Sequence, residues 1–380
     1  MLKNKIYNYL SNEILKNFII ILLTFTAIAW VVRAVNFLDL IVEDGYTSTI
    51  YFKYSFLNIT TLITRFVPLS FLLALTISIV KFEKQQELLI LWTSGLTKIK
   101  IANIFLSIGF FMTLFQLILS LFINPYLLNK SRTLLKISDG LQVSSVLKSN
   151  DFSDTFKGLT FYVGEKNTNN ELLNIFIKDV GGNLKTVAEE AEETKNTTII
   201  AKKGYVDNNK LILFNGIIHS LNKKNKFKNI EFEKTELSLA DISTRTITVP
   251  KIQETSSILL LKCILNKDNN LTLDNCSKKD EFKREAIQNI SRRLGSPLYI
   301  PLISIIVSFL LIYKKEKKYN FLKKYILFIL SFLILILTEI FLKYTGLTYT
   351  ATFFYFIFPL IFTIFFYIYL MKKIISEKVI

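Results

Sequence analysis

The sequence predicts a membrane α-helical fold in which six transmembrane helices, three and three, flank an inserted all-β domain. Each of six apolar stretches is about as long as the ~20 residues that a helix needs to cross a bilayer. A long polar segment separates the third stretch from the fourth. Because the bilayer interior offers unpaired backbone groups no partner, these stretches must be helical. They are residues 18–41, 59–80, 101–123, 294–313, 325–342 and 351–371.

Composition agrees with a membrane protein, since 51% of residues are hydrophobic, 33 are Phe and the mean hydropathy is +0.38. The net charge of +17 raises the question of nucleic-acid binding. The lysines and arginines, however, gather beside the apolar stretches, where the cytoplasmic bias of positive loops explains them. We therefore expect no nucleic-acid partner.

The distribution of positive charge among the loops predicts the orientation of the chain. Basic residues are frequent in alternate loops and rare in the others, and positively charged loops stay in the cytoplasm. We expect both termini to be cytoplasmic and the inserted domain to lie outside, in the periplasm if the membrane is the inner membrane of a Gram-negative bacterium. The basic loops contain Lys3, Lys5 and Lys16; Lys81, Lys84, Lys98 and Lys100; Lys314, Lys315, Lys317, Lys318, Lys323 and Lys324; and Lys372, Lys373 and Lys378.

Three regions follow from this layout. Residues 1–125 are expected to hold the first three helices and a short cytoplasmic helix near residues 83–97. Residues 126–290 should form the outer domain with its C-terminal connector, and residues 291–380 the last three helices. Within the outer domain, short β-rich runs separated by polar turns favour an antiparallel sandwich or a jelly roll. The runs are residues 159–163, 174–178, 197–201, 210–214, 216–221 and 227–232.

Catalytic residues are not evident. His219, the one histidine, falls in a predicted strand without Ser, Cys or metal-ligand partners at a recognisable spacing. The sequence has no Walker A loop, so any ATP would be hydrolysed by another chain. We therefore expect no enzyme activity, no metal and no cofactor in this chain.

Four arginines lie at the outer ends of the predicted helices. Charges at such positions either snorkel to the interface or form a functional group. At similar depth the four could form a basic collar, whose guanidinium groups suit the phosphates of an anionic lipid headgroup. They are Arg33, Arg65, Arg292 and Arg293.

The predicted short helix after the second span begins near Glu87, continues through Leu91 and ends at Gly95. A glycine commonly ends a helix in this way. The helix is either an interfacial segment with no further role or a coupling helix that docks into a cytoplasmic motor. Cys263 and Cys276, both on the outer side, could form a disulfide in an oxidising compartment.

Several motifs in order along the chain resemble the lipopolysaccharide export permeases of the LptF/LptG type, and LptF more closely. They are Val31-Val32-Arg33, Val67-Pro68-Leu69-Ser70, Gln86-Glu87-Leu88 with Ser94-Gly95-Leu96-Thr97, Gly158-Leu159-Thr160-Phe161-Tyr162-Val163, and Ser291-Arg292-Arg293-Leu294 with Pro297. The similarity covers nearly the whole chain.

This resemblance implies an ABC-type exporter. Two such permeases, one of each type, would pair above a cytoplasmic ATPase dimer, LptB. Lipopolysaccharide would enter from the outer leaflet of the inner membrane and pass through the jelly roll to those of LptC and LptA. In that family pattern, Glu87 would dock into the ATPase and Arg33 would contact the phosphorylated headgroup.

Other classes remain open. One is an ABC permease for another envelope lipid or lipoprotein, although permeases of the lipoprotein-release type usually have four helices. Another is a scaffold that transports nothing and needs no ATPase. A lipid-modifying membrane enzyme would require a catalytic constellation near the outer interface, which the sequence does not show.

Overall fold

The structure, a computed structural model, describes residues 2–42, 46–139, 149–156, 158–167, 171–180, 194–207, 210–222, 227–238, 251–265, 280–312 and 317–377. The longer helices are α1 (Leu2–Asn36), α3 (Ser48–Leu57), α4 (Ile59–Lys84), α6 (Lys98–Ile118), α7 (Asn124–Asp139), α10 (Asp280–Gly295), α11 (Tyr299–Ser308), α12 (Lys317–Tyr344) and α13 (Tyr349–Glu377). The shorter ones are α2 (Asp39–Val42), α5 (Glu87–Thr93), α9 (Ser257–Ile264), the π-helix η1 (Leu119–Ile123) and the 3-10 turns η2 (Ile252–Glu254), η3 (Ser296–Leu298) and η4 (Phe309–Leu311).

The chain divides into two compact units. The first, which we call the helical unit, comprises Met1–Val31, Asn58–Leu128 and Lys251–Ile380. The second comprises Val32–Leu57 and Asn129–Pro250 and contains the β-sheet. Six helical segments among the described residues are long and apolar enough to cross a membrane, as the sequence predicts. They are Lys5–Val42, Ser48–Lys84, Lys98–Leu135, Phe282–Leu311, Leu322–Tyr344 and Tyr349–Ser376.

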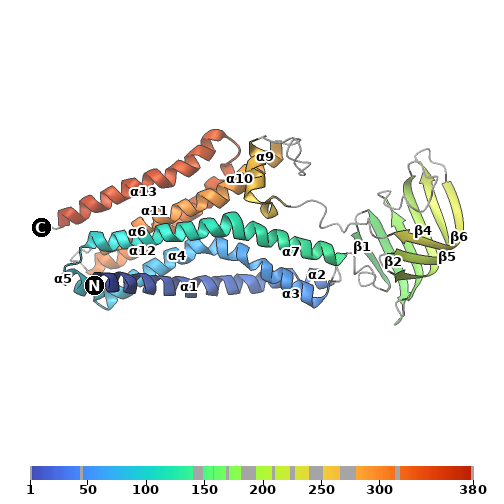
Figure 1. Ribbon diagram of the computed structural model, residues 1–380, viewed down its shortest axis with the longest axis horizontal. Coiled ribbons are helices and arrows are strands. Elements are labelled where there is room, and N and C mark those ends of the chain that lie inside the picture. Colours follow the sequence, from blue (N-terminus) through green and yellow to red (C-terminus); the bar gives the residue numbers. More distant parts are fainter. Residues whose placement is uncertain are drawn as a thin grey trace. The chain divides into compact units, whose positions relative to one another are not determined.

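The centre of the helical unit is α11, all ten of whose residues are buried. It contacts α4, α6, α12 and α13 (Figure 1). By contrast, α1, α12 and α13 expose many large apolar side chains, among them Ile20, Ile326 and Phe354. A helix that is apolar on its outer face is expected where the solvent is lipid rather than water. The start of α1 and the end of α13 lie at the same end of this unit as α5 (Figure 1).

Prolines within the helical segments leave carbonyl groups that other helices satisfy. A proline has no N–H to donate to the carbonyl four residues earlier, and a bilayer requires that carbonyl to find another partner. At four prolines the partner is a side chain from a different helix. The Gln116 amide donates to the Thr64 carbonyl that Pro68 leaves open (3.2 Å), and the Ser257 hydroxyl donates to the Leu121 carbonyl that Pro125 leaves open (2.8 Å). In the same way, the Ser120 hydroxyl donates to the Arg293 carbonyl before Pro297 (2.8 Å), and the Tyr299 hydroxyl donates to the Tyr355 carbonyl before Pro359 (3.1 Å).

In the second unit, six strands form one antiparallel sheet in the order β1-β2-β3-β4-β5-β6. The strands are β1 (Asp151–Phe156), β2 (Leu159–Lys166), β3 (Glu171–Asp179), β4 (Thr194–Asp207), β5 (Lys210–Asn222) and β6 (Phe227–Ser238). The predicted inserted antiparallel β domain is confirmed, although β1 was not predicted and the runs at 210–214 and 216–221 form one strand. The described strands make a simple meander, so jelly-roll topology stays a prediction.

A crease crosses this sheet from β2 to β6. Cα pairing lapses at one position in each of the five strands, and two of those positions, Asn174 and Asn215, have positive φ angles of 53° and 52°. Each strand skips one residue there without a change of register, so the alternation of side chains reverses and the buried face changes parity. In β4, for example, Ile199 and Ala201 are buried before the crease and Gly204 after it. Both halves of the sheet thus contribute to one apolar core.

Candidate functional site

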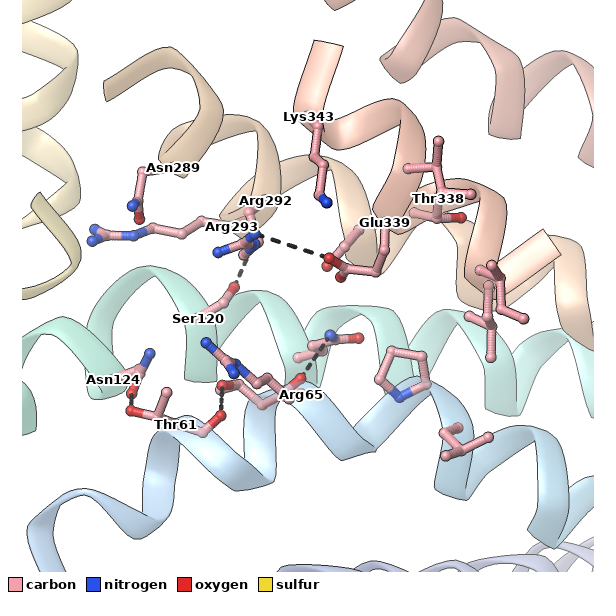
Figure 2. Close-up of a pocket in the computed structure, with 18 of the residues that line it drawn as sticks. Thr61, Arg65, Ser120, Asn124, Asn289, Arg292, Arg293, Thr338, Glu339 and Lys343 are labelled. Atoms are coloured by element: carbon pink, nitrogen blue, oxygen red, sulfur yellow. Dashed lines mark hydrogen bonds and ion pairs between the residues drawn. The ribbon is translucent and has the colours of Figure 1, made fainter. Parts of the chain in front are cut away.

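A cavity with a volume of about 450 Å³ lies in the helical unit (Figure 2). Its walls come from the first turns of α4, from α6 with η1, from the end of α10 and from the C-terminal half of α12. The wall is mostly apolar, with Pro68, Leu69 and Leu335 among its members. An apolar cleft with a few convergent polar groups is the usual form of a ligand site.

The polar side chains of this cavity carry an excess of positive charge. Arg65, Arg292, Arg293 and Lys343 line it, against the single carboxylate of Glu339. Figure 2 shows these side chains coming from α4, α10 and α12. Three of the four arginines predicted from the sequence therefore meet at one site, on elements far apart in the chain. Cations at an apolar cleft suit an amphipathic anion.

The fourth predicted arginine, Arg33, is half-buried in the last turn of α1. It belongs to the second unit. The structure therefore brings three of the predicted residues together, and the collar of four stays a prediction.

The two adjacent arginines of α10 differ in their surroundings. Arg293 is 6% exposed. Its Nη1 donates to the carbonyl of Thr255 at 3.0 Å and to the Ser257 hydroxyl at 2.7 Å, and its Nη2 donates to the carbonyls of Gln253 at 3.0 Å and Ile252 at 3.4 Å. These bonds fasten the segment before α9 to the end of α10. Arg293 thus shapes the cavity wall more than it offers a charge to a ligand.

Arg292, by contrast, keeps a side chain that is 45% exposed. Its Nη2 lies 3.9 Å from a carboxylate oxygen of Glu339, whose side chain is 65% exposed. A pair this long and this open contributes little to stability, since exposed ion pairs are worth about 0–1 kcal/mol. Arg292 and the exposed Arg65 are therefore the arginines best placed to meet a ligand.

Local hydrogen bonds fix the floor of the cavity. Pro68 leaves the Thr64 carbonyl to the side chain of Gln116, and the hydroxyl of Thr61 donates to Asn124 Oδ1 at 3.0 Å. The π-helix η1, which supplies Ser120 to the wall, interrupts the regular α-helix at this point. Single π turns inside α-helices are frequent at functional sites.

Sequence reasoning did not single out Glu339, Lys343 or Gln116. One signal for Glu339 was available, because it is the only charged residue between positions 325 and 342. An ionisable residue within a membrane span is a functional candidate by default. Gln116 could not be recognised, since its role depends on a carbonyl that faces it from another helix.

At the other end of α4, the predicted short helix is present as α5. Gln86 separates it from α4 with a φ of 60°, and Gly95 ends it with a φ of 88°. Leu96 N–H bonds the Leu91 carbonyl and Gly95 N–H bonds that of Trp92, which is the Schellman arrangement of a helix end. Gly95 is thus required by the backbone, whereas Glu87 and Leu91 face a separate small groove.

The remaining predicted residues have structural surroundings or cannot be placed. Cys263 is buried on α9 and Cys276 lies outside the described residues, so their disulfide stays a prediction. His219 on β5 hydrogen-bonds Asn229 on β6, Nδ1 to Oδ1, at 2.8 Å. Among the described residues, no cluster of His, Cys, Asp or Glu could hold a metal ion.

Six apolar helical segments with a β domain inserted between the third and the fourth define a multi-pass membrane protein. The chain matches the family model of the lipopolysaccharide export system permease LptF/LptG over residues 8–373. It therefore belongs to the LptF/LptG family of lipopolysaccharide export permeases, proteins of the inner membrane. The match does not distinguish LptF from LptG. Comparison with curated proteins gave no match.

Proposed function

We propose that this chain is one of the two permeases of an ABC-type exporter, and that its cationic cavity holds the phosphorylated headgroup of lipopolysaccharide. The observation that carries this proposal is the meeting of Arg65, Arg292 and Lys343 at an apolar cleft of about 450 Å³. The acyl chains would remain against the apolar wall and the exposed helix faces, where their burial is favourable.

The remaining parts of the proposal rest on family membership. The partner permease would be of the other type, LptG if this chain is LptF. A cytoplasmic LptB dimer would supply ATP hydrolysis and would dock at α5 through Glu87 and Leu91. LptC and the periplasmic LptA would receive the lipid through jelly-roll domains. Both termini would then be cytoplasmic and the β domain periplasmic.

Paired substitutions on α10 test the headgroup site. Arg292→Gln removes a positive charge from the cavity, and Arg284→Gln removes one from an exposed position of the same helix that is not part of the lining. Each variant is purified in mild detergent from its native membrane, and bound lipopolysaccharide is measured by phosphate and fatty-acid analysis. We expect Arg292→Gln to lower bound lipid several-fold and Arg284→Gln to leave it unchanged.

Equal lipid content in the two variants would overturn the headgroup assignment. Recovery of a different lipid or a lipoprotein in stoichiometric amount would favour a permease for that cargo instead. Failure of any ATPase to copurify with the wild-type chain, in several detergents, would favour a scaffold that transports nothing.

A further inference from the structure

A small groove separates the start of α1 from α5. It has a volume of about 290 Å³. The two helical segments that line it, the start of α1 and α5, lie at the end of the helical unit that also contains the end of α13 (Figure 1). Three residues of α1 form one wall and three of α5 form the other. They are Lys5, Ile6 and Tyr9, opposite Glu87, Ile90 and Leu91.

Tyr9 fixes the carboxylate of Glu87 at the edge of this groove. Its hydroxyl donates to both carboxylate oxygens, at 3.1 and 3.2 Å. The Tyr9 ring packs on the fully buried ring of Phe82, with centroids 6.2 Å apart, so the hydroxyl is held by packing as well as by hydrogen bonds. Hydrogen bonding to a tyrosine keeps the carboxylate in one orientation without neutralising its charge.

Near the groove, α1 contacts the end of α4, and α5 follows α4 directly in the chain. Lys81 at the end of α4 forms an ion pair with Glu13, one turn after Tyr9 on α1. The left-handed conformation of Gln86 turns the chain from α4 into α5 immediately before Glu87. The groove is therefore a preformed feature of α1 and α5 together.

The exposed surface beside the carboxylate is apolar. Leu89 is 56% exposed and Ile90 is 61% exposed, although α5 has only seven residues. An apolar patch around one fixed negative charge is complementary to a protein surface that offers an apolar side chain next to an arginine or lysine. Arginine is enriched at such interfaces because its planar donors match a carboxylate.

We infer that the start of α1 is part of the ATPase docking surface, and that Tyr9 is a positioning residue that presents Glu87 to a basic side chain of the LptB-type ATPase. This inference rests on the proposed function. It adds to the docking surface the groove wall of α1, which consists of Lys5, Ile6 and Tyr9. Because the carboxylate is ordered before the ATPase arrives, binding has less side-chain freedom to remove.

The test uses the purified permease pair in detergent, titrated with the LptB-type ATPase of the same cell in the presence of ATP. Tyr9→Phe removes only the hydroxyl, and Tyr7→Phe makes the same change at a tyrosine of α1 outside the groove lining. Ordering one side chain is expected to change the apparent dissociation constant by roughly three- to tenfold. We expect that rise for Tyr9→Phe and none for Tyr7→Phe.

A double-mutant cycle separates positioning from packing. Glu87→Gln should weaken ATPase binding, and adding Tyr9→Phe to it should have no further effect, because the hydroxyl then has no carboxylate to orient. Independent, multiplying effects of the two substitutions would overturn the positioning role. So would a Tyr9→Phe variant that binds like Tyr7→Phe while the wild type binds well. If the wild type itself bound no ATPase, the proposed function would fall too.

Discussion

Replacement of Arg293 by methionine is expected to destabilise the helical unit severely. The guanidinium makes four hydrogen bonds, at 2.7, 3.0, 3.0 and 3.4 Å, to groups between Ile252 and Ser257. Methionine is apolar and supplies no donor, so the carbonyls of Gln253 and Thr255 lose the guanidinium. The Ile252 carbonyl still accepts from the Thr255 hydroxyl, and the Ser257 hydroxyl still donates to the Leu121 carbonyl. Leaving a buried acceptor without its donor costs about 1–3 kcal/mol. The stability of Arg293→Lys should lie between those of the wild type and Arg293→Met, because an ammonium group still offers three donors, although from a single point.

The neighbouring Arg292 provides the matched control. It has the same charge and is one residue away, but its side chain is 45% exposed and its partner Glu339 is 3.9 Å away. Arg292→Met should therefore cost about 1 kcal/mol or less. Both variants are heated in mild detergent, and loss of the folded monomer is followed by size-exclusion chromatography. Equal midpoints for Arg292→Met and Arg293→Met would refute the distinction between a structural and a ligand-facing arginine.

Three further changes probe other features of the chain. Gln116→Leu removes the donor to the Thr64 carbonyl and should cost about 1 kcal/mol of stability, measured by the same heating assay. Asn215→Val places a branched side chain at a φ of 52° and should cost about 1–2 kcal/mol, whereas Asn215→Gly should be tolerated. Lys324→Glu breaks the 2.8 Å ion pair with Glu83 and should lower the melting midpoint; the reversed pair, with Glu83→Lys added, should recover most of the loss.

Much of the helical architecture could be predicted because a bilayer imposes length and composition on each span. The ends of the helices were less predictable. The apolar stretch at 18–41 begins well after the observed start of α1 at Leu2. The first turns of α1 are helical but contain many polar residues, so hydropathy does not mark where the helix begins.

The site was predicted in part. Arg65 and Arg292 could be chosen as charges near helix ends, and they do line the cavity. The structural role of Arg293 could not be predicted. Its partners are mostly backbone carbonyls of the segment before α9, and backbone groups are the same whatever the residue type. Asn215 presents a similar case. It separates two β-rich runs and therefore resembles a turn, but in the sheet it is the crease of a single strand, β5.

The four prolines with cross-helix partners bear on how this protein can move. An ordinary helix bends at the expense of its own hydrogen-bond ladder. At Pro68, Pro125, Pro297 and Pro359 the ladder is already open, and a side chain from another helix completes it. Each of these points therefore depends on two helices, since one carries the proline and the other supplies the hydrogen-bond donor. A bend at any of them that moved the carbonyl away from its donor would break a hydrogen bond between two helices, so bending one helix is coupled to the position of its neighbour.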